Sequence, residues 1–449
     1  MIRAKKANYE SHPSHFLIVI SVLITLIVID VSVIRIYDYV SKLFIPTNDR
    51  EILFVILSLG CLAGEFILIE FMRPLRTTQE RKTKLHVGLI YWITRLTQYF
   101  LGAGVIYVIL QMLIGSSYNT ISLMVIISSS YILSVCILGV FMARMLRLLP
   151  FRRDMIILVL FVLAIGSVTA NIMITLVNVS LRLSERPSET RVLLAASMDI
   201  SKGRFNTLDN LYFVSYLISF ITAWIATATL LHHYSYKVGK AKYWLITTVP
   251  MIFFAAQFIP LYTSVFLPLI KFDPFFTSTL VTIIATLSKP FAGLMLGIGF
   301  WTMASVVEKN SPIRRYLVFT GFGLFLLFSA NQAILMSIAP YPPYGIATIT
   351  VMGLSAYMIV IGLYTSTISI SQDSRLRSYI RRLASPQSTL FDSIVSAESS
   401  KEIEQKVMEV VKKHSFGMED QSGIETSLDD VEVQRYLKEV IEEVKRHKV

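Results

Sequence analysis

The sequence predicts an all-α protein: a polytopic membrane bundle of about ten helical spans, followed by a small helical cytoplasmic tail. Three observations predict this class. The 449 residues are 54% hydrophobic and only 16% charged, whereas a soluble domain carries about 25% charged residues. Ten stretches are long and apolar enough to cross a bilayer. Lys and Arg are concentrated in every second connection between these stretches.

A membrane-spanning helix needs roughly 20 consecutive, mostly apolar residues, because it crosses about 30 Å of hydrocarbon. The stretches that meet this requirement lie near residues 16–36, 52–72, 86–114, 119–142, 155–181, 210–231, 243–270, 275–306, 316–338 and 345–370. The first stretch contains Asp30, Arg35 and Asp38 and lacks a small-residue cleavage site. We therefore expect it to be a retained span and not a signal peptide.

The basic residues orient the spans, because Lys and Arg are retained in cytoplasmic loops. The N-terminal arm and every second connection are rich in them, as in Arg73–Lys84, Arg144–Arg153, Lys237–Lys242 and Lys309–Arg315. This alternation continues through all ten spans. It predicts a multi-pass protein of the cell membrane with both termini in the cytoplasm.

The formal net charge of +12 first suggests a nucleic-acid partner. However, most of the excess lies beside the expected spans, while the tail is slightly acidic. The chain also has no aromatic-interleaved basic patch of the kind that binds nucleic acid. We therefore expect the lipid bilayer to be the partner of these cations and predict no nucleic-acid binding.

Two domains are predicted, residues 1–370 in the membrane and residues 371–449 as an amphipathic helical tail. A long external loop at 182–209 divides the spans five and five, and Ser188–Met198 could form a short amphipathic helix in it. Five spans per half would invert the second half, as in many secondary transporters, but the halves share no evident sequence repeat. In the tail, residues 387–447 contain two amphipathic helices that could pair with each other, a protein partner or a second copy.

Charges at membrane depth indicate functional candidates, because each costs about 2.5–3.5 kcal/mol on insertion scales. Lys289 lies well inside the eighth expected span and precedes Pro290, which removes a backbone donor and opens the helix. An ammonium there could bind an anion or a carboxylate. The alternatives are a structural ion pair or a lysine that snorkels to the interface.

Glu65 is the natural counter-charge for Lys289, near the middle of the second span. Gly60 and Gly64 allow another helix to approach closely, so we expect Glu65 to face a helix contact and not lipid. It could accept a proton, bind a cation or be a structural carboxylate. Asp30 is the deepest charge of the first span, and Glu70 should pair with Arg73 at i, i+3.

The seventh span carries Pro250, Pro260 and Pro268, with Gln257 between the first two. Broken helices commonly line cavities. The candidate cavity or ion-pathway residues are therefore Lys289, Glu65, Gln257 and Asp30.

No catalytic motif stands out. The seven histidines form no zinc-binding spacing, and neither a phosphate-binding glycine loop nor a nucleophile elbow is present. The two cysteines, Cys61 and Cys136, lie inside spans as small apolar residues. We predict no cofactor and no metal, and we lean against an enzyme.

The last span begins after Ala339-Pro340-Tyr341-Pro342-Pro343-Tyr344-Gly345 and ends in Ser369-Ile370-Ser371-Gln372-Asp373. This pattern resembles a group of uncharacterised archaeal multi-spanning membrane proteins. The resemblance implies a multi-pass location and a cytoplasmic tail, and no activity or site residue. The double proline by itself predicts a rigid external turn.

Two functions are favoured, with a membrane-embedded enzyme as a further alternative. The first is a transporter-like or channel-like protein in which Lys289, Glu65 and Gln257 converge on one polar midplane cavity and a small molecule or ion is the substrate. The second is a membrane receptor, regulator or assembly protein that signals through its tail, which predicts a continuous helix across residue 370.

Overall fold

The computed structural model describes residues 13–43, 47–79, 87–147, 156–191, 206–233, 239–255, 290–305, 312–332 and 341–372. Helix accounts for 92% of the described residues, which confirms the helical class. The elements are α1 (Pro13–Leu43), α2 (Thr47–Gln79), α3 (Val87–Gly115), β1 (Ser117–Asn119), α4 (Thr120–Leu146), α5 (Ile156–Ser184), β2 (Glu189–Arg191), α7 (Asn206–His233), α9 (Lys240–Ala255), α12 (Pro312–Ala330) and α13 (Ile346–Gln372). A further apolar helix is described over Pro290–Ser305, here called the 290–305 helix.

The chain divides into two compact units. Unit 1 comprises residues 1–143 and 159–366, and unit 2 comprises residues 144–158 and 367–449. Nearly all the described residues belong to unit 1, so the fold and the site below are those of unit 1. The predicted tail helices over 387–447 lie outside the described residues.

Seven of the described helices are long and apolar enough to cross a membrane, so the chain is a multi-pass helical membrane protein. They correspond to the first six expected spans and the tenth. The expected spans at 243–270, 275–306 and 316–338 fall partly on residues that the structure does not describe, and the total of ten stays a prediction. The ninth differs where it is described, because α12 ends at Ala330.

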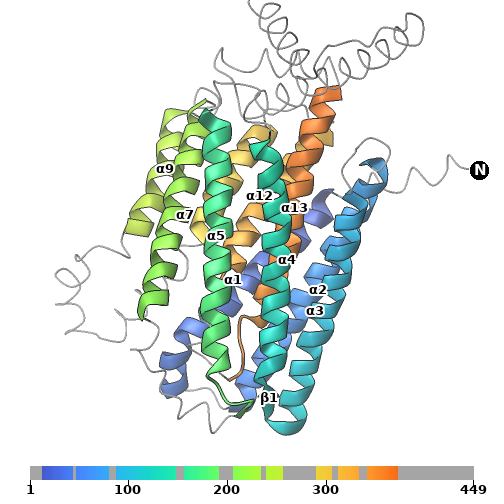
Figure 1. Ribbon diagram of the computed structural model, residues 1–449, viewed down its shortest axis with the longest axis vertical. Helices are drawn as coiled ribbons and strands as arrows, with labels where there is room; N and C mark the ends of the chain where they lie inside the picture. The colour runs from blue at the N-terminus through green and yellow to red at the C-terminus, as the bar shows by residue number, and fades with distance from the viewer. Residues whose placement is uncertain are drawn as a thin grey trace, which may run out of the picture. The chain divides into compact units, whose positions relative to one another are not determined.

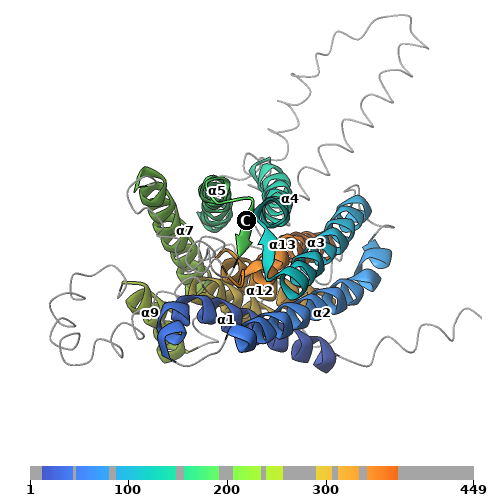
Figure 2. The ribbon, with the colours of Figure 1, turned by 90° about the horizontal axis from the view of Figure 1, so that it is seen from below.

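Within unit 1, α12 and α13 are central helices, and α1 to α5, α7 and α9 surround them (Figures 1 and 2). The apolar span of α13 is 100% buried within the protein, whereas that of α1 is only 28% buried. Hydropathy does not predict this difference in burial, because α1 and α13 are both apolar enough to span a membrane. The difference comes from position, since α13 contacts protein on all sides and α1 presents one face outward.

Glycines allow the central helices to pack closely. An added side chain at Gly362 of α13 would meet the carbonyl of Tyr316 in α12, and one at Gly323 of α12 would meet Met358 and Ile359. The 290–305 helix approaches the other side of α12 at Gly297, whose Cβ would lie 2.9 Å from the Gly321 carbonyl oxygen. Small residues at such contacts let backbones meet where lipid supplies no hydrophobic drive.

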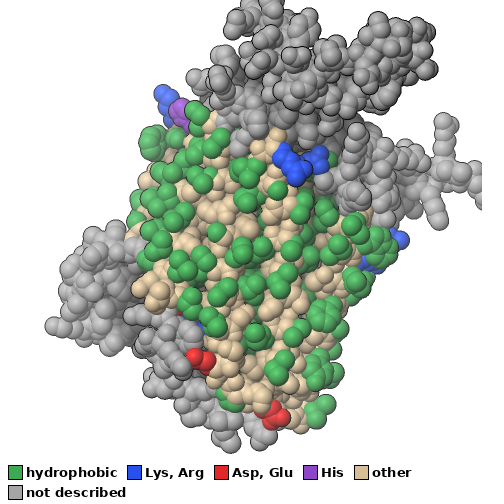
Figure 3. Space-filling view, viewed as in Figure 1, with side chains coloured by type: hydrophobic (Ala, Val, Ile, Leu, Met, Phe, Trp, Pro, Cys, Tyr) green, Lys and Arg blue, Asp and Glu red, His purple; other side chains and the backbone are tan. Residues whose placement is uncertain are grey.

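The outward faces of the surrounding helices are apolar. Large side chains such as Leu96, Ile114, Ile156 and Trp244 are more than half exposed. Figure 3 shows hydrophobic side chains over the visible face, with cations and acids gathered toward its two ends. An apolar band with charged ends is the surface that a bilayer covers.

The connection that follows α5 contains a strand, and its described residues do not begin the expected short helix. Residues Glu189–Arg191 form β2, which pairs antiparallel with β1, with Tyr118 opposite Thr190. The Thr120 side chain donates to the Pro187 carbonyl at 2.7 Å, and its amide donates to the Ser188 carbonyl at 2.9 Å. These bonds hold the chain extended after Pro187, so Ser188–Arg191 does not form the start of the expected helix, and residues 192–198 lie outside the described residues. The end of the bundle at β1 and β2 is called the strand end below.

Candidate functional site

Two central helices end near the middle of the bundle and not at its surface. The side chain of Asn331, the residue after α12, contacts Tyr131 and Asn171, which lie near the middles of the 27-residue α4 and the 29-residue α5. The first turn of α13 is bound at the same depth, because Ser130 donates to the Ile349 carbonyl at 2.7 Å. This depth is called the mid-level.

The polar residues Tyr131, Asn171, Ser215 and Asn331 form a connected chain, called the mid-level cluster. The Tyr131 hydroxyl donates to Asn331 Oδ1 at 3.2 Å, and Asn331 Nδ2 donates to Asn171 Oδ1 at 2.8 Å. Asn171 Nδ2 then donates to Ser215 Oγ at 2.8 Å. The cluster joins α4, α5 and α7 to the end of α12, and Asn171, Asn331 and Ser215 are buried.

The end of α12 also carries buried polar atoms that lack a partner. Gln332 Nε2 and Ser329 Oγ have no hydrogen-bond partner among the residues that the structure describes, although Gln332 is 4% exposed and Ser329 only 1%. Gln332 N bonds to the Ala330 carbonyl, which ends the helix with a tight turn. Because an unpaired buried polar group costs about 1–3 kcal/mol, these atoms mark a place where a polar ligand or water is favoured.

Asp30 of α1 caps the mid-level end of α13. Its two carboxylate oxygens each lie 3.1 Å from the Gly345 amide nitrogen, and Oδ2 accepts a hydrogen bond from Thr348 Oγ1 at 2.6 Å. Gly345 has a positive φ of 89°, which a residue without Cβ adopts readily. A carboxylate at a helix N-terminus satisfies orphan N–H groups and the positive end of the helix dipole.

Glu65 of α2 binds the next turn of the same helix. It is completely buried and contacts Gln98 of α3 through Nε2 and Thr350 of α13 through Oγ1, the latter at 2.7 Å. The expected glycine contact is present, because Gly60 and Gly64 pack on Leu26 and Leu23 of α1. Glu65 therefore faces a helix contact and not lipid, as expected from the sequence.

Tyr341–Gly345 leads from the strand end to the start of α13. The Tyr341 hydroxyl donates to Glu51 at 2.9 Å, and the Tyr344 hydroxyl donates to the Arg50 carbonyl at 2.7 Å. All five residues are buried. The expectation of an external turn at the double proline is therefore wrong, because both tyrosines anchor the segment inside the bundle.

At the strand end, Tyr118 of β1 stacks on Tyr341 with ring centroids 6.2 Å apart. Burial raises the pKa of the Tyr118 hydroxyl, while the nearby Arg186 guanidinium lowers it in part. Burial also lowers the pKa of Arg186. The neutral phenol and the cation are therefore compatible neighbours, and this pair is a structural support for the Tyr341 segment.

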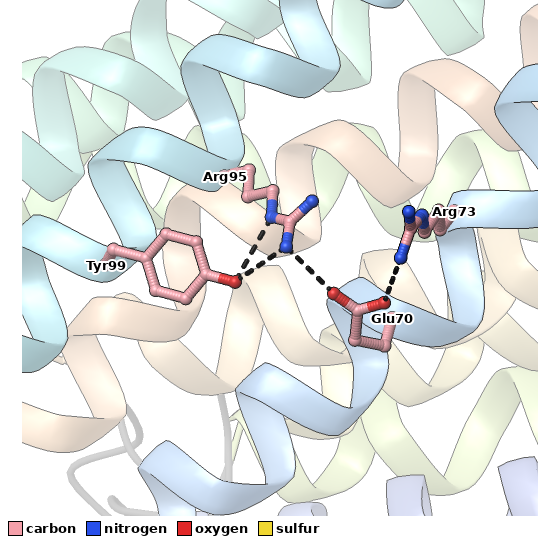
Figure 4. Close-up of polar contacts among 4 residues, drawn as sticks. All are labelled: Glu70, Arg73, Arg95 and Tyr99. Carbon is pink, nitrogen blue, oxygen red and sulfur yellow. Dashed lines mark hydrogen bonds and ion pairs between the residues drawn. The ribbon is translucent and has the colours of Figure 1, made fainter.

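The expected pair between Glu70 and Arg73 is present at 3.5 Å. Arg95 of α3 completes it by binding Glu70 at 3.1 Å and the Tyr99 hydroxyl at 2.9 Å (Figure 4). The Glu70 side chain is 48% exposed, and exposed ion pairs contribute about 0–1 kcal/mol. This cluster ties α2 to α3 near the surface and is distinct from the mid-level.

Of the four sequence candidates, the structure brings two, Asp30 and Glu65, to one helix. Lys289 and Gln257 lie outside the described residues, so their convergence with Glu65 stays a prediction. Sequence reasoning missed Gln98, Thr348 and Thr350 beside the carboxylates, and the whole mid-level cluster. The one available signal was Asn331-Gln332, a pair of amides inside the expected ninth span.

No cluster of three or more His, Cys, Asp or Glu side chains suited to a metal ion occurs among the described residues. The mid-level can instead bind through neutral amides, hydroxyls and helix ends. Comparisons with protein-family models, with curated proteins and with solved structures find no match to this chain.

Proposed function

We propose that the protein is a transporter of a small polar solute whose path passes through the mid-level cluster. The observation that carries this proposal is the meeting of the α12 C-terminus and the α13 N-terminus at the mid-level, beside buried polar atoms without described partners. Discontinuous helices that end at the bilayer midplane are typical of secondary transporters, in which the freed backbone groups bind the substrate.

The chemistry of the cluster favours a solute with both hydrogen-bond donors and acceptors. Asn171, Asn331 and Gln332 each offer an amide nitrogen and an amide oxygen, and the end of α12 offers carbonyl groups with partial negative charge. Lys289 precedes Pro290 in the sequence and remains our candidate for an anion-binding group of the path. We further propose ten spans in the cell membrane with both termini cytoplasmic, which reporter fusions at the two termini test.

The path itself is tested by thiol labelling in a variant that lacks Cys61 and Cys136, both replaced by Ala. Gln332→Cys in this background is treated in proteoliposomes with a membrane-impermeant methanethiosulfonate reagent. We expect labelling from the aqueous phase, because a transport path must admit water to the mid-level. Leu324→Cys is the matched buried control, since Leu324 lies in α12, about two turns before Gln332, and is 0% exposed, and it should not react.

Glu189→Cys is the positive control, because Glu189 is exposed at the strand end. Labelling of Glu189→Cys without any labelling of Gln332→Cys, from either side of the membrane, would contradict the proposed path.

One observation favours a second candidate, a regulator that signals through its tail. Helix α13 is continuous across residue 370, up to Gln372, as that reading requires. Truncation after residue 384 separates the two functions. If the protein is a transporter, Gln332→Cys is still labelled after the truncation. If it is a regulator, the truncation abolishes signalling through the tail while the membrane bundle stays folded.

A further inference from the structure

The buried carboxyl of Glu65 and a backbone carbonyl both contact one hydroxyl group, that of Thr350. Thr350 Oγ1 lies 2.7 Å from Glu65 Oε1 and 2.6 Å from the Ala347 carbonyl oxygen. A hydroxyl group has a single hydrogen to donate. If Glu65 were ionised, both neighbours of this hydroxyl would be acceptors, and one of the two short oxygen–oxygen contacts would have no hydrogen between its atoms.

A proton on Glu65 resolves this conflict. Glu65 Oε1 then donates to Thr350 Oγ1, and Thr350 Oγ1 donates to the Ala347 carbonyl. Glu65 Oε2 accepts from Gln98 Nε2, which also donates to the Thr350 carbonyl at 3.3 Å. Each of these contacts of the carboxyl is satisfied in this arrangement, and Glu65 carries no buried charge.

Asp30, which binds the same helix α13, has the opposite set of hydrogen-bond partners. Its described partners are all donors, the Gly345 amide and the Thr348 hydroxyl, and it lies at the positive end of the α13 dipole. These contacts stabilise an ionised carboxylate. The two buried carboxyls that bind α13 are therefore distinguished by geometry, one charged and one neutral.

The helices packed against Glu65 supply little compensating charge. Within about two turns of its contacts, their titratable groups are Asp30 on α1, Cys61 and Glu70 on α2, Tyr91, Arg95 and Tyr99 on α3, and Tyr357 on α13. Arg95 is the cation of this set, and it is bound to Glu70 at the surface. Cys61 lies close enough to interact electrostatically with both Asp30 and Glu65. The negative charge of Asp30 further favours a neutral Glu65.

We propose that Glu65 is a proton-binding site whose carboxyl carries a proton in this conformation and exchanges it with water in another. When the O–H bond of Glu65 breaks, the proton passes to water and the electron pair stays on the carboxylate. The Thr350 hydroxyl then turns its hydrogen from the Ala347 carbonyl to Glu65 Oε1, so α13 responds directly to the proton. As the coupling ion of transport, a role that rests on the proposed function, this proton would bias the mid-level between two conformations.

The proton is tested by infrared difference spectroscopy of the full chain in lipid, in H₂O and in D₂O. A protonated carboxyl gives a carbonyl stretch above the amide band that shifts on deuteration. We expect this band in the wild-type protein and its loss in Glu65→Gln, whose amide can donate to Thr350 as the acid does. Asp30→Asn is the matched control and should keep the band.

Thr350→Val keeps the test decisive if Glu65→Gln fails to fold. Without the Thr350 acceptor, the free carboxyl should absorb at higher frequency. A wild-type spectrum without the band, or a band that Asp30→Asn removes and Glu65→Gln leaves, overturns the assignment to Glu65.

Coupling is tested separately through the labelling rate of Gln332→Cys against pH, divided by that of Glu189→Cys to remove the pH dependence of thiol reactivity. We expect this ratio to change with pH when Glu65 is present and to be independent of pH in Glu65→Gln. A band at Glu65 with an unlabelled Gln332→Cys leaves the proton site standing and rejects the transport path. A band with a pH-independent ratio rejects the coupling role alone.

Discussion

Asp30 and Glu65 are two buried carboxyls that bind neighbouring turns of one helix, yet the structure treats them differently. Asp30 caps the α13 N-terminus and receives the Gly345 amide and the Thr348 hydroxyl. Glu65 lies one turn along and shares Thr350 with a backbone carbonyl. Burial alone therefore does not set the role of a membrane carboxyl. The number of donors around it decides whether it is a fixed charge or a place for a proton.

The largest effect is expected for Asp30→Asn. The amide keeps the size of the side chain but removes the charge and presents N–H groups to the α13 N-terminus. We expect a loss of about 2–4 kcal/mol in the free energy of unfolding, since the hydrogen bonds to a charged group and the favourable charge at the positive end of the helix dipole are both lost. The measurement is denaturant unfolding in detergent followed by circular dichroism.

Val22→Ala is the control for Asp30→Asn, because Val22 lies on the same helix and is 53% exposed. It should change the free energy of unfolding by far less. An Asp30→Asn protein as stable as the wild type would mean that Asp30 is neutral in the native state.

A paired substitution of two threonines measures the charge difference directly. Thr348→Val removes a donor to an ionised carboxylate and should cost about 1.5–3 kcal/mol, whereas Thr350→Val removes the partner of a neutral acid and should cost about 0.5–1.5 kcal/mol. Both substitutions are on buried positions of α13, so differences in packing largely cancel. If unfolding shows that Thr350→Val costs as much as Thr348→Val or more, the two carboxyls do not differ in charge.

The smallest effect is expected at Glu70, an exposed carboxylate of the same helix as Glu65. Glu70→Gln removes its pairs with Arg73 and Arg95 and should cost less than about 1 kcal/mol, with the difference shrinking in high salt. Unfolding at low and high ionic strength checks it. A large, salt-insensitive loss would show that this surface cluster is a structural centre comparable to Asp30.

Much of the bundle follows from local sequence. The apolar runs predict the helices that surround the centre, and α13 begins and ends within two residues of its expected span. The glycines beside Glu65 indicated a close helix contact, which α1 supplies. These predictions succeed because hydropathy and small-residue spacing act within one helix.

The contacts of the candidate site required the tertiary structure. Nothing in the local sequence distinguishes Asn171 and Asn331 from other asparagines of membrane helices, and 160 residues separate the two. The end of α12 at Ala330 is set by a turn and by the contacts of Asn331, where hydropathy continues to favour a helix. The strand at Glu189–Arg191 likewise depends on β1 and Thr120, far away along the chain.

The apolar runs are enough to predict a helical membrane protein, and the cost of a charge in lipid is enough to mark Asp30 and Glu65 as candidates. The burial of α13 at the centre and the binding of both carboxyls to it follow from the packing of the folded bundle. Asp30 lies 315 residues from Gly345 and Glu65 lies 285 from Thr350. Apolarity is a property of each segment and can be read locally, whereas the donors that fix a carboxyl come from helices that meet only in the folded bundle.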